Sequence, residues 1–233
     1  MFLVINAIAI DGPGASGKST TAKLVAERLG YMHLDTGAMY RAVTLACVRE
    51  NVAPEDSPEL ERIVAGLDLR FTRDADGKQQ LLMNGADVSL DIRTPEISRL
   101  VSAYSALPYV RERMLEIQRA IGSSEPVVCE GRDIGTRVFP DARFKFFLSA
   151  SLEERARRRH QELEAQGFSQ SLESIIEELE KRDRKDSTRA HSPLRQAADT
   201  LVVDTSNMTI HEQVEFVINH ITERGLPAAG EKV

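Results

Sequence analysis

A glycine-rich segment near the start of the chain reads Ile8-Ala9-Ile10-Asp11-Gly12-Pro13-Gly14-Ala15-Ser16-Gly17-Lys18-Ser19-Thr20-Thr21 and follows the pattern G-x-x-x-x-G-K-S. Glycine accepts a positive φ and brings no Cβ toward an anion, so such a loop can turn several backbone N–H groups toward one point. We expect Lys18 to reach the β- and γ-phosphates of a nucleotide and the Ser19 hydroxyl to face Mg²⁺. Residues 12–20 are therefore predicted to bind a nucleoside triphosphate.

The residues on either side of the loop support this prediction. Residues 4–10 read as a buried strand, and residues 20–29 carry apolar side chains at helical spacing. A helix that starts near Lys18 turns the positive end of its dipole toward the nucleotide. The alternative, a glycine-rich turn that happens to precede a helix, leaves this match of strand, loop and helix to chance.

Length and composition describe an ordinary globular protein. With 233 residues the chain can bury a full core as one domain, or as one domain that carries inserted pieces. The net charge of -6 and the 5% of aromatic residues both disfavour a nucleic acid as partner. No apolar run approaches the roughly 18 residues of a membrane helix, so no membrane partner is expected.

The expected location is the cytoplasm. Residues 1–10 are apolar but have no basic leader, and we interpret them as a core strand rather than a signal peptide. Cys47 and Cys129 fall in an expected helix and an expected strand, which suits reduced packing residues of a cytosolic protein better than a disulfide.

Strands and helices alternate along most of the chain. Apolar runs predict buried strands at 4–10, 31–34, 125–129, 142–148 and 200–204. With helices between them, they predict an α/β fold in which a five-stranded parallel sheet is flanked by helices. Residues 225–233 read as a frayed tail.

Helices are expected from Thr36, which is predicted to cap the first of them, and then at 58–67, 95–121 with an interruption at Pro108, 151–165, 172–185 and 210–224. Between the second and third of these, short strands at 68–71, 79–83 and 86–90 are joined by turns at 74–77 and 84–85. This small antiparallel patch is interpreted as an inserted subdomain.

Charged residues come directly after one buried strand, as Glu130-Gly131-Arg132-Asp133. Ligands bind at the carboxyl ends of strands in open parallel sheets, so a functional role is favoured here. Tyr40 and Arg41 stand near the start of a helix and would also lie beside the phosphate loop. For that pair, a core-edge Tyr and a surface Arg remain the alternative.

Arginine dominates the basic residues, with 23 of 30. Its planar fork grips phosphate and carboxylate, but genome composition would give the same bias, so position must decide. Residues 151–165 carry Arg155, Arg157, Arg158 and Arg159, and Arg155 and Arg159 lie four apart with no acid at the intervening helical spacing to neutralise them. A solvated helical hairpin is the simple alternative; beside a phosphate loop, we favour a lid that closes over a polyphosphate.

Further motifs occur in a characteristic order. They are Asp35-Thr36-Gly37-Ala38-Met39-Tyr40-Arg41, Ile92-Arg93-Thr94, Glu130-Gly131-Arg132-Asp133-Ile134-Gly135-Thr136, Phe139-Pro140-Asp141-Ala142 and the segment from Arg182 to Arg189. With the phosphate loop, they make the chain closely resemble the bacterial cytidylate kinases over almost its whole length. The loop alone indicates only the P-loop class, whereas G-R-D-I-G-T and D-T-G-A-M-Y-R are specific to this family.

The resemblance implies a nucleoside monophosphate kinase with a P-loop NTPase fold, which transfers phosphate from ATP to CMP and dCMP with Mg²⁺. It implies one domain, with a core of residues 1–61, 96–150 and 190–233, a nucleotide-binding insert at about 62–95 and a helical lid at about 151–189. It also implies a monomer.

The resemblance further implies roles for individual residues. Thr36, Tyr40, Arg41, Arg132 and Arg189 match residues that line the acceptor nucleotide. Ser102, Arg111 and Asp133 match those that read the cytosine ring, Arg182 and Asp186 the pair near the sugar, and Arg155, Arg158 and Arg159 the lid, with Arg158 on the ATP side. Glu130 stands where the family more often has Asp, so an acid is retained with a longer reach.

Phosphoryl transfer between two polyanions requires fixed cations rather than a strong base, because the attacking phosphate oxygen is already ionised. The expected catalytic set is Lys18, Arg132, Arg155, Arg159 and Arg182. The five histidines, His33, His160, His191, His211 and His220, are interpreted as structural or surface residues. Two alternatives stay open: a P-loop kinase of another small metabolite and a nucleotide-gated switch, although no N-K-x-D guanine motif is present.

Overall fold

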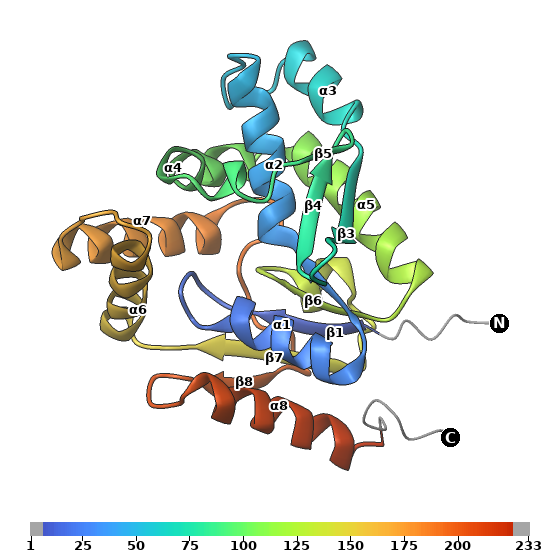
Figure 1. Ribbon diagram of the computed structural model, residues 1–233, viewed down its shortest axis with the longest axis vertical. Coiled ribbons are helices and arrows are strands. Elements are labelled where there is room, and N and C mark those ends of the chain that lie inside the picture. Colours follow the sequence, from blue (N-terminus) through green and yellow to red (C-terminus); the bar gives the residue numbers. More distant parts are fainter. Residues whose placement is uncertain (1–6, 226–233) are drawn as a thin grey trace. The chain divides into compact units, whose positions relative to one another are not determined.

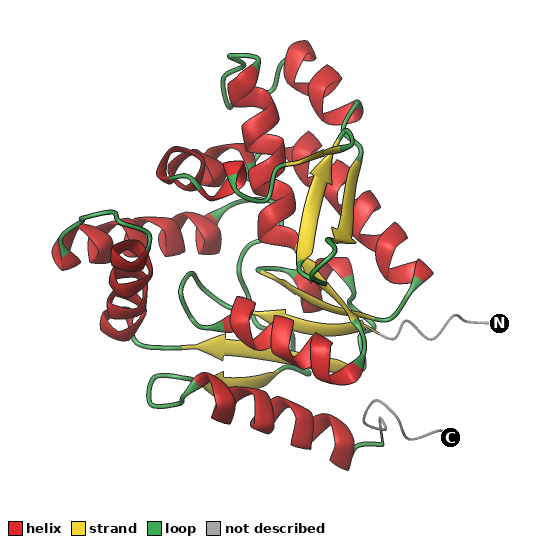
Figure 2. Ribbon diagram, viewed as in Figure 1, coloured by secondary structure: helices red, strands yellow, loops and turns green. Residues whose placement is uncertain are grey.

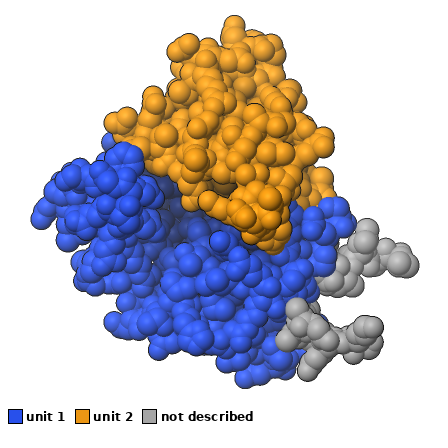
Figure 3. All heavy atoms as spheres, viewed as in Figure 1, with its two compact units in different colours: residues 1–33, 122–233 blue, residues 34–121 orange. Residues whose placement is uncertain are grey.

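The computed structural model describes residues 7–225, in which helices and strands alternate (Figure 1; Figure 2). The start of the first predicted strand and nearly all of the predicted tail lie outside these residues. The chain divides into two compact units, one made of residues 1–33 with 122–233 and the other of residues 34–121 (Figure 3).

The first unit is built on the five-stranded sheet that the sequence predicts. Its strands are β1 (Ala7–Asp11), β2 (Met32–Asp35), β6 (Val127–Gly131), β7 (Phe144–Ser149) and β8 (Leu201–Asp204), in the order β2-β6-β1-β7-β8. Strand β1 pairs in parallel with β6 on one side and with β7 on the other, and β7 pairs in parallel with β8. The α/β sheet is therefore confirmed, with strand ends that differ only slightly from the predicted ones.

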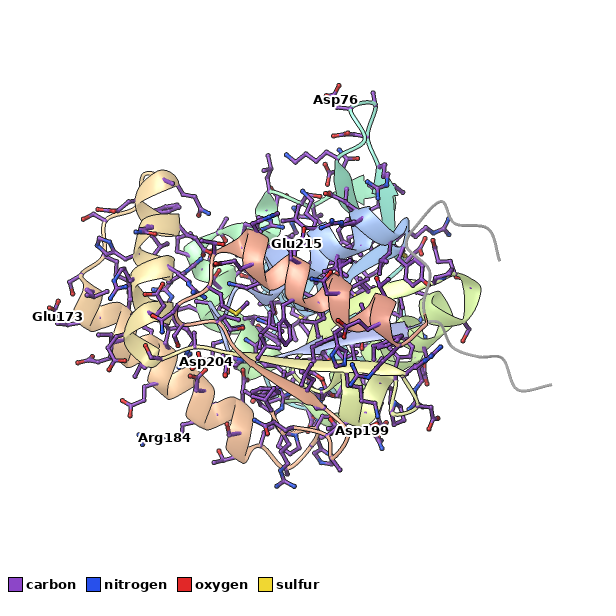
Figure 4. All side chains as sticks on the ribbon, turned by 90° about the horizontal axis from the view of Figure 1, so that it is seen from below. Asp76, Glu173, Arg184, Asp199, Asp204 and Glu215 are labelled. Atoms are coloured by element: carbon purple, nitrogen blue, oxygen red, sulfur yellow. The ribbon has the colours of Figure 1, made fainter. Side chains whose placement is uncertain are left out.

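Helices α1 (Lys18–Leu29) and α8 (Ile210–Glu223) bury their apolar sides against one face of this sheet. Alternate side chains of a strand point to the same face, so Ile8, Ile10 and Phe146 all join this core. The buried hydroxyl of Thr21 donates to Gln213 Oε1 at 2.8 Å, which joins the two helices. On the surface, Arg28 of α1 pairs with Glu215 of α8, labelled in Figure 4.

Helices α6 (Leu152–Ala165) and α7 (Leu172–Thr188) form a hairpin in the same unit (Figure 1). They pack through a small core of their own, Ala156, Leu163, Ile175 and Leu179. The side chains of Ser151 and Ser171 each accept a backbone N–H at the start of their helix, as N-caps do. The predicted pair of charged helices is confirmed.

The second unit contains α2 (Thr36–Arg49), α3 (Pro58–Ala65), β3 (Leu69–Arg73), β4 (Gln79–Met83), β5 (Ala86–Asp87), the short 3-10 turn η1 (Asp91–Arg93), α4 (Pro95–Tyr104) and most of α5 (Pro108–Ser124). Strand β4 pairs antiparallel with β3 and β5, as predicted. The turn between β4 and β5 has positive φ at both Asn84 and Gly85. The predicted helix over 95–121 is interrupted before Pro108 and gives α4 and α5.

Two local predictions in this unit are wrong. Thr36 does not cap α2; Asp35 does, because its Oδ1 accepts from the Ala38 N–H at 2.8 Å. The strand expected over 86–90 ends at Asp87, since the Asp87 carboxylate accepts from both the backbone N–H and the hydroxyl of Ser89 and turns the chain.

Cys47 and Cys129 are buried in α2 and β6, a helix and a strand as the sequence predicts. Among residues 7–225, the helices are all too short or too polar to cross a membrane.

Asp11, the last residue of β1, ties this strand to the segment that follows β6. Its buried carboxylate accepts the N–H groups of Ile134 at 2.9 Å and Gly135 at 2.8 Å, at the start of the π-helical turn η2 (Ile134–Val138). Burial raises the pKa of Asp11 from 3.8 to about 6; the two N–H bonds oppose this, and the nearby Asp133 adds to it.

This shifted pKa predicts a pH-dependent stability. Between about pH 4 and pH 6 the folded chain binds a proton that the unfolded chain has released, so stability falls as pH rises. We expect the free energy of unfolding of the unaltered protein, measured against Asp11→Asn, to fall by on the order of 3 kcal/mol between pH 4 and pH 7. Urea unfolding of both proteins at a series of pH values measures this change. If the free energies of unfolding of the two proteins differ by the same amount at every pH, the pKa of Asp11 is not raised.

Candidate active site

The phosphate loop, residues 12–17, joins β1 to α1 and has the backbone that the glycine pattern predicts. At Gly12 φ is 155°, and a Cβ there would lie 2.1 Å from the carbonyl oxygen of Leu148 at the end of β7. Gly17 is the N-cap of α1 with φ 86°. Ala15 also has a positive φ, 59°, which the sequence did not predict.

The loop has donor groups that suit a polyphosphate. The Lys18 ammonium is buried and donates to the Pro13 carbonyl at 3.1 Å. The Ser16 hydroxyl is fully buried and has no hydrogen-bond partner in the part of the chain that the structure describes. At its N-terminus α1 has neither a side-chain cap nor an acidic residue in its first turn. The buried Lys18 ammonium and the Ser16 hydroxyl, next to the positive end of a helix dipole, fit the oxygens of ATP.

Arg132 and Asp186 form the centre of an arginine cluster. Arg132, directly after β6, donates Nε–H to Asp186 Oδ2 at 2.8 Å, and Arg189 Nη1 lies 3.6 Å from Asp186 Oδ1. Burial alone would raise the pKa of Asp186, but Arg132, Arg182 and Arg189 together hold it below its ordinary value. Three guanidinium groups around one carboxylate form a cationic cluster, whose charge favours the binding of an anion.

The cluster reaches the phosphate loop. Nη2 of Arg132 lies 3.8 Å from the position that a Cβ on Gly14 would take. Arg155 of α6, also buried, donates to the Gly14 carbonyl at 3.3 Å. Two of the predicted catalytic arginines therefore lie beside the same turn of the loop.

The expectation that no acid neutralises Arg155 and Arg159 is wrong. Arg155 pairs with Asp183 of α7 at 2.7 Å, and Arg159 pairs with Glu162 at 3.2 Å. Helical spacing does not indicate Asp183, because it lies on another helix, whereas Glu162 lies three residues after Arg159 on the same helix.

Arg158 makes a different set of contacts. It pairs with Glu154 at 3.1 Å and donates to the Thr205 carbonyl at 2.6 Å. The Thr205 hydroxyl in turn donates to the Ser16 carbonyl at 3.0 Å, so Arg158 is joined to the phosphate loop through one residue. Thr205 follows β8, and only its position after a buried strand could have drawn attention to it.

Ser19, Glu130 and His33 form a chain of hydrogen bonds. The Ser19 hydroxyl donates to Glu130 Oε2 at 2.6 Å, and His33 Nε2 lies 3.2 Å from Glu130 Oε1. Glu130 is 2% exposed and lies inside β6, one residue before the strand ends. A hydroxyl next to a carboxylate at the phosphate loop is a donor set that suits Mg²⁺, which takes one or two protein ligands together with phosphate oxygens.

The second unit holds the other predicted acceptor residues. The Arg111 guanidinium carbon lies 5.3 Å from the centre of the Tyr40 ring, and the same side chain donates to the Ser105 carbonyl at 3.1 Å. Arg41 Nη2 lies 3.4 Å from Asp35 Oδ2. The buried hydroxyl of Ser102 has no hydrogen-bond partner among the described residues. Thr36 is buried in the first turn of α2.

The structure thus brings predicted site residues together in two sets. In the first unit they are Lys18, Arg132, Arg155, Arg158, Arg182, Asp186 and Arg189, near or joined to the phosphate loop, with Asp133 directly after Arg132 and Arg159 farther along α6. In the second unit they are Thr36, Tyr40, Arg41, Ser102 and Arg111. Four residues for which the sequence predicted no binding or catalytic role contact residues at or near this site: Asp11, His33, Asp183 and Thr205.

The chain is similar to known proteins over nearly its full length. A family model described as cytidylate kinase matches residues 8–223. The cytidylate kinase of Geobacter sp. (strain M21) is 50% identical over 217 residues, 93% of each chain, and that of Pelotomaculum thermopropionicum is 46% identical over 92% of this chain and 95% of its own. A crystal structure of an uncharacterized protein from Eubacterium ventriosum aligns with a TM-score of 0.50 and 15% identity over 94% of this chain and 98% of its own, a likeness of fold alone. The chain belongs to the cytidylate kinase family.

Proposed function

We propose that the protein transfers the γ-phosphoryl group of ATP to CMP or dCMP and releases ADP with CDP or dCDP. The observation that carries this proposal is the arginine cluster around Asp186, which reaches Gly14 of the phosphate loop. Such a cluster suits a second phosphate-bearing substrate beside the phosphate loop. Family membership supports the same donor and acceptor.

The transfer is a displacement at phosphorus. An ionised oxygen of the CMP phosphate attacks the γ-phosphorus and forms the new P–O bond. The bond from that phosphorus to the oxygen it shares with the β-phosphate breaks, and its electron pair leaves with ADP. Charge spreads over the equatorial oxygens, where Lys18, Arg132 and Arg155 would stabilise it.

The remaining catalytic arginines, Arg159 and Arg182, are proposed to act from the helical hairpin. Arg155 and Arg159 each have an acidic partner in this structure, so they would exchange a carboxylate for phosphate when nucleotides bind. The arginines would give up their carboxylate partners only where a polyanion is present to replace them. This exchange would limit the hydrolysis of ATP by water when no acceptor is bound.

Ser19 and Glu130 are proposed to hold Mg²⁺, Ser19 directly and Glu130 beside it. The bound ion would supply positive charge to the β- and γ-phosphate oxygens. Within the described residues no cluster of three or more His, Cys, Asp or Glu side chains could hold a metal ion. The phosphates of ATP would therefore provide the other ligands.

Base selection is assigned to Asp133, Arg111 and Ser102. Cytosine has an N4 amine that donates and O2 and N3 that accept, so Asp133 would accept from N4 while Arg111 donates to the ring. The hydroxyl of Ser102, which has no protein partner among the described residues, is free to bond the ring as well. Thr36, Tyr40, Arg41 and Arg189 would line the rest of the acceptor, with Arg182 and Asp186 near its sugar.

We propose the nucleotide-binding insert at about 62–95 and the lid at about 151–189 as the parts that close over the two nucleotides. The enzyme is proposed to act as a monomer in the cytoplasm, where the buried thiols of Cys47 and Cys129 would stay reduced.

An acceptor panel tests the substrate. With CMP, dCMP, UMP and AMP in a coupled assay for ADP, we expect turnover of CMP and dCMP and at least a roughly 100-fold lower kcat/KM for UMP, because uracil presents a carbonyl to the Asp133 carboxylate. Comparable rates for UMP and CMP would rule out this role of Asp133. Consumption of ATP at the same rate without any acceptor would favour the nucleotide-gated switch, and turnover of none of the four, a kinase of another metabolite.

A second test separates acceptor from donor. We expect Arg132→Ala to lower kcat/KM for CMP by on the order of 10³, since one arginine of this kind contributes 10³ to 10⁵ in related enzymes. Calorimetry should find the affinity for ATP nearly unchanged.

The matched control is Arg184→Ala, on the exposed side of α7 (Figure 4), where the Arg184 side chain lies 3.6 Å from Glu180. Arg184→Ala should leave both kcat/KM for CMP and the affinity for ATP unaltered. A loss of ATP affinity in Arg132→Ala with normal use of CMP is the result that would move Arg132 to the donor side.

A further inference from the structure

His33 and Glu130 form a buried pair on neighbouring strands. His33 lies in β2 and Glu130 in β6, which are adjacent in the sheet. His33 is 8% exposed and Glu130 2%, whereas Ser19 at the other end of the chain of hydrogen bonds is exposed. A polar connection thus runs from the exposed end of the phosphate loop into the core.

The chemistry of the pair sets the direction of the bond. A carboxylate only accepts, so His33 Nε2 carries the proton that lies between it and Glu130 Oε1. The other oxygen, Oε2, accepts from Ser19 at 2.6 Å. Both oxygens of one carboxylate are therefore engaged by groups on different elements.

Glutamate has one more rotatable bond than aspartate, so its carboxylate needs an additional restraint to keep one orientation. Contact with Ser19 alone would not supply it, because that hydroxyl is the group proposed to bind Mg²⁺. A bond from the core side fixes the carboxylate independently of what happens at Ser19. Hydrogen bonds that orient a metal-binding side chain commonly decide how tightly the site binds its metal.

We propose that His33 is a positioning residue, which holds Glu130 by its Oε1 so that Oε2 faces Ser19 and the Mg²⁺ that accompanies ATP. This inference rests on the proposed function, because it requires the metal to bind at Ser19. A histidine in the core would then contribute to the affinity for Mg²⁺, which a residue that only fills space would not do.

The test compares variants that differ at the Nε2–H group. His33→Leu keeps a similar volume and removes the donor, and His33→Gln keeps an N–H at similar reach. His220→Leu is the matched control, since His220 lies in α8 and its ring makes an edge contact with Phe146 of β7, with centroids 5.4 Å apart. For each protein, calorimetry measures the affinity for a non-hydrolysable ATP analogue over a series of Mg²⁺ concentrations and in excess EDTA.

We expect His33→Leu to raise the Mg²⁺ concentration at half-maximal effect by roughly 10- to 100-fold and to leave the affinity in EDTA unchanged. His33→Gln should restore most of the loss, and His220→Leu should behave as the unaltered protein. Adding His33→Leu to Glu130→Gln should have almost no further effect, because the group that it positions is already altered.

Two results would overturn the proposal. One is an equal loss of analogue affinity with Mg²⁺ and in EDTA; the other is a His33→Gln protein no better than His33→Leu. If His33→Leu does not fold, His33→Asn takes its place, because its shorter amide stays polar but does not reach Oε1. If the affinity of the unaltered protein for the ATP analogue does not depend on Mg²⁺, the proposed metal site itself is wrong, whatever the role of His33.

Discussion

The parallel pairing of β1 on both sides is the constraint on which the phosphate-binding region depends. Asp11 lies opposite Gly131 of β6 and opposite Phe147 of β7, so the three strands reach the same edge at nearly the same level. The phosphate loop, the Arg132 segment and the start of α6 consequently all begin at this edge. Parallel sheets bind ligands there for this reason.

Charge balance is the second organising element of the site. Each arginine near the loop whose contacts are described has a carboxylate or carbonyl partner: Arg132 has Asp186, Arg155 has Asp183 and Arg158 has the Thr205 carbonyl. A buried guanidinium without a partner would be costly, so these acids stabilise the site before a nucleotide enters. Under the proposed function, the same acids would compete with phosphate, so nucleotide binding would have a cost and would require the hairpin to rearrange.

The features that could be predicted from the sequence are those that local residues determine. The positive φ at Gly12 and Gly17 follows from the spacing of a short loop, and the alternation of strands and helices follows from hydrophobic period. Five predicted strands are present because buried parallel strands are apolar on both faces and therefore easy to recognise.

What the sequence could not supply depends on distant residues or on a choice between neighbours. Glu130 and His33 are 97 positions apart, and nothing in either segment indicates the other. Asp183 meets Arg155 only because two helices pack against each other. Asp35 and Thr36 are both good caps, and the backbone decided for Asp35, whose φ and ψ are extended while Thr36 is already helical. The division of acceptor residues between two units is likewise a property of the folded chain.

The close approach at Gly12 also limits how this protein can vary. The atom that a Cβ would strike is the backbone oxygen of Leu148, so no repacking of side chains could make room for it. Strand β7 would have to move, yet it is hydrogen-bonded to β1 and β8 on its two sides. Gly12 is therefore a position at which directed evolution or design has no alternative residue.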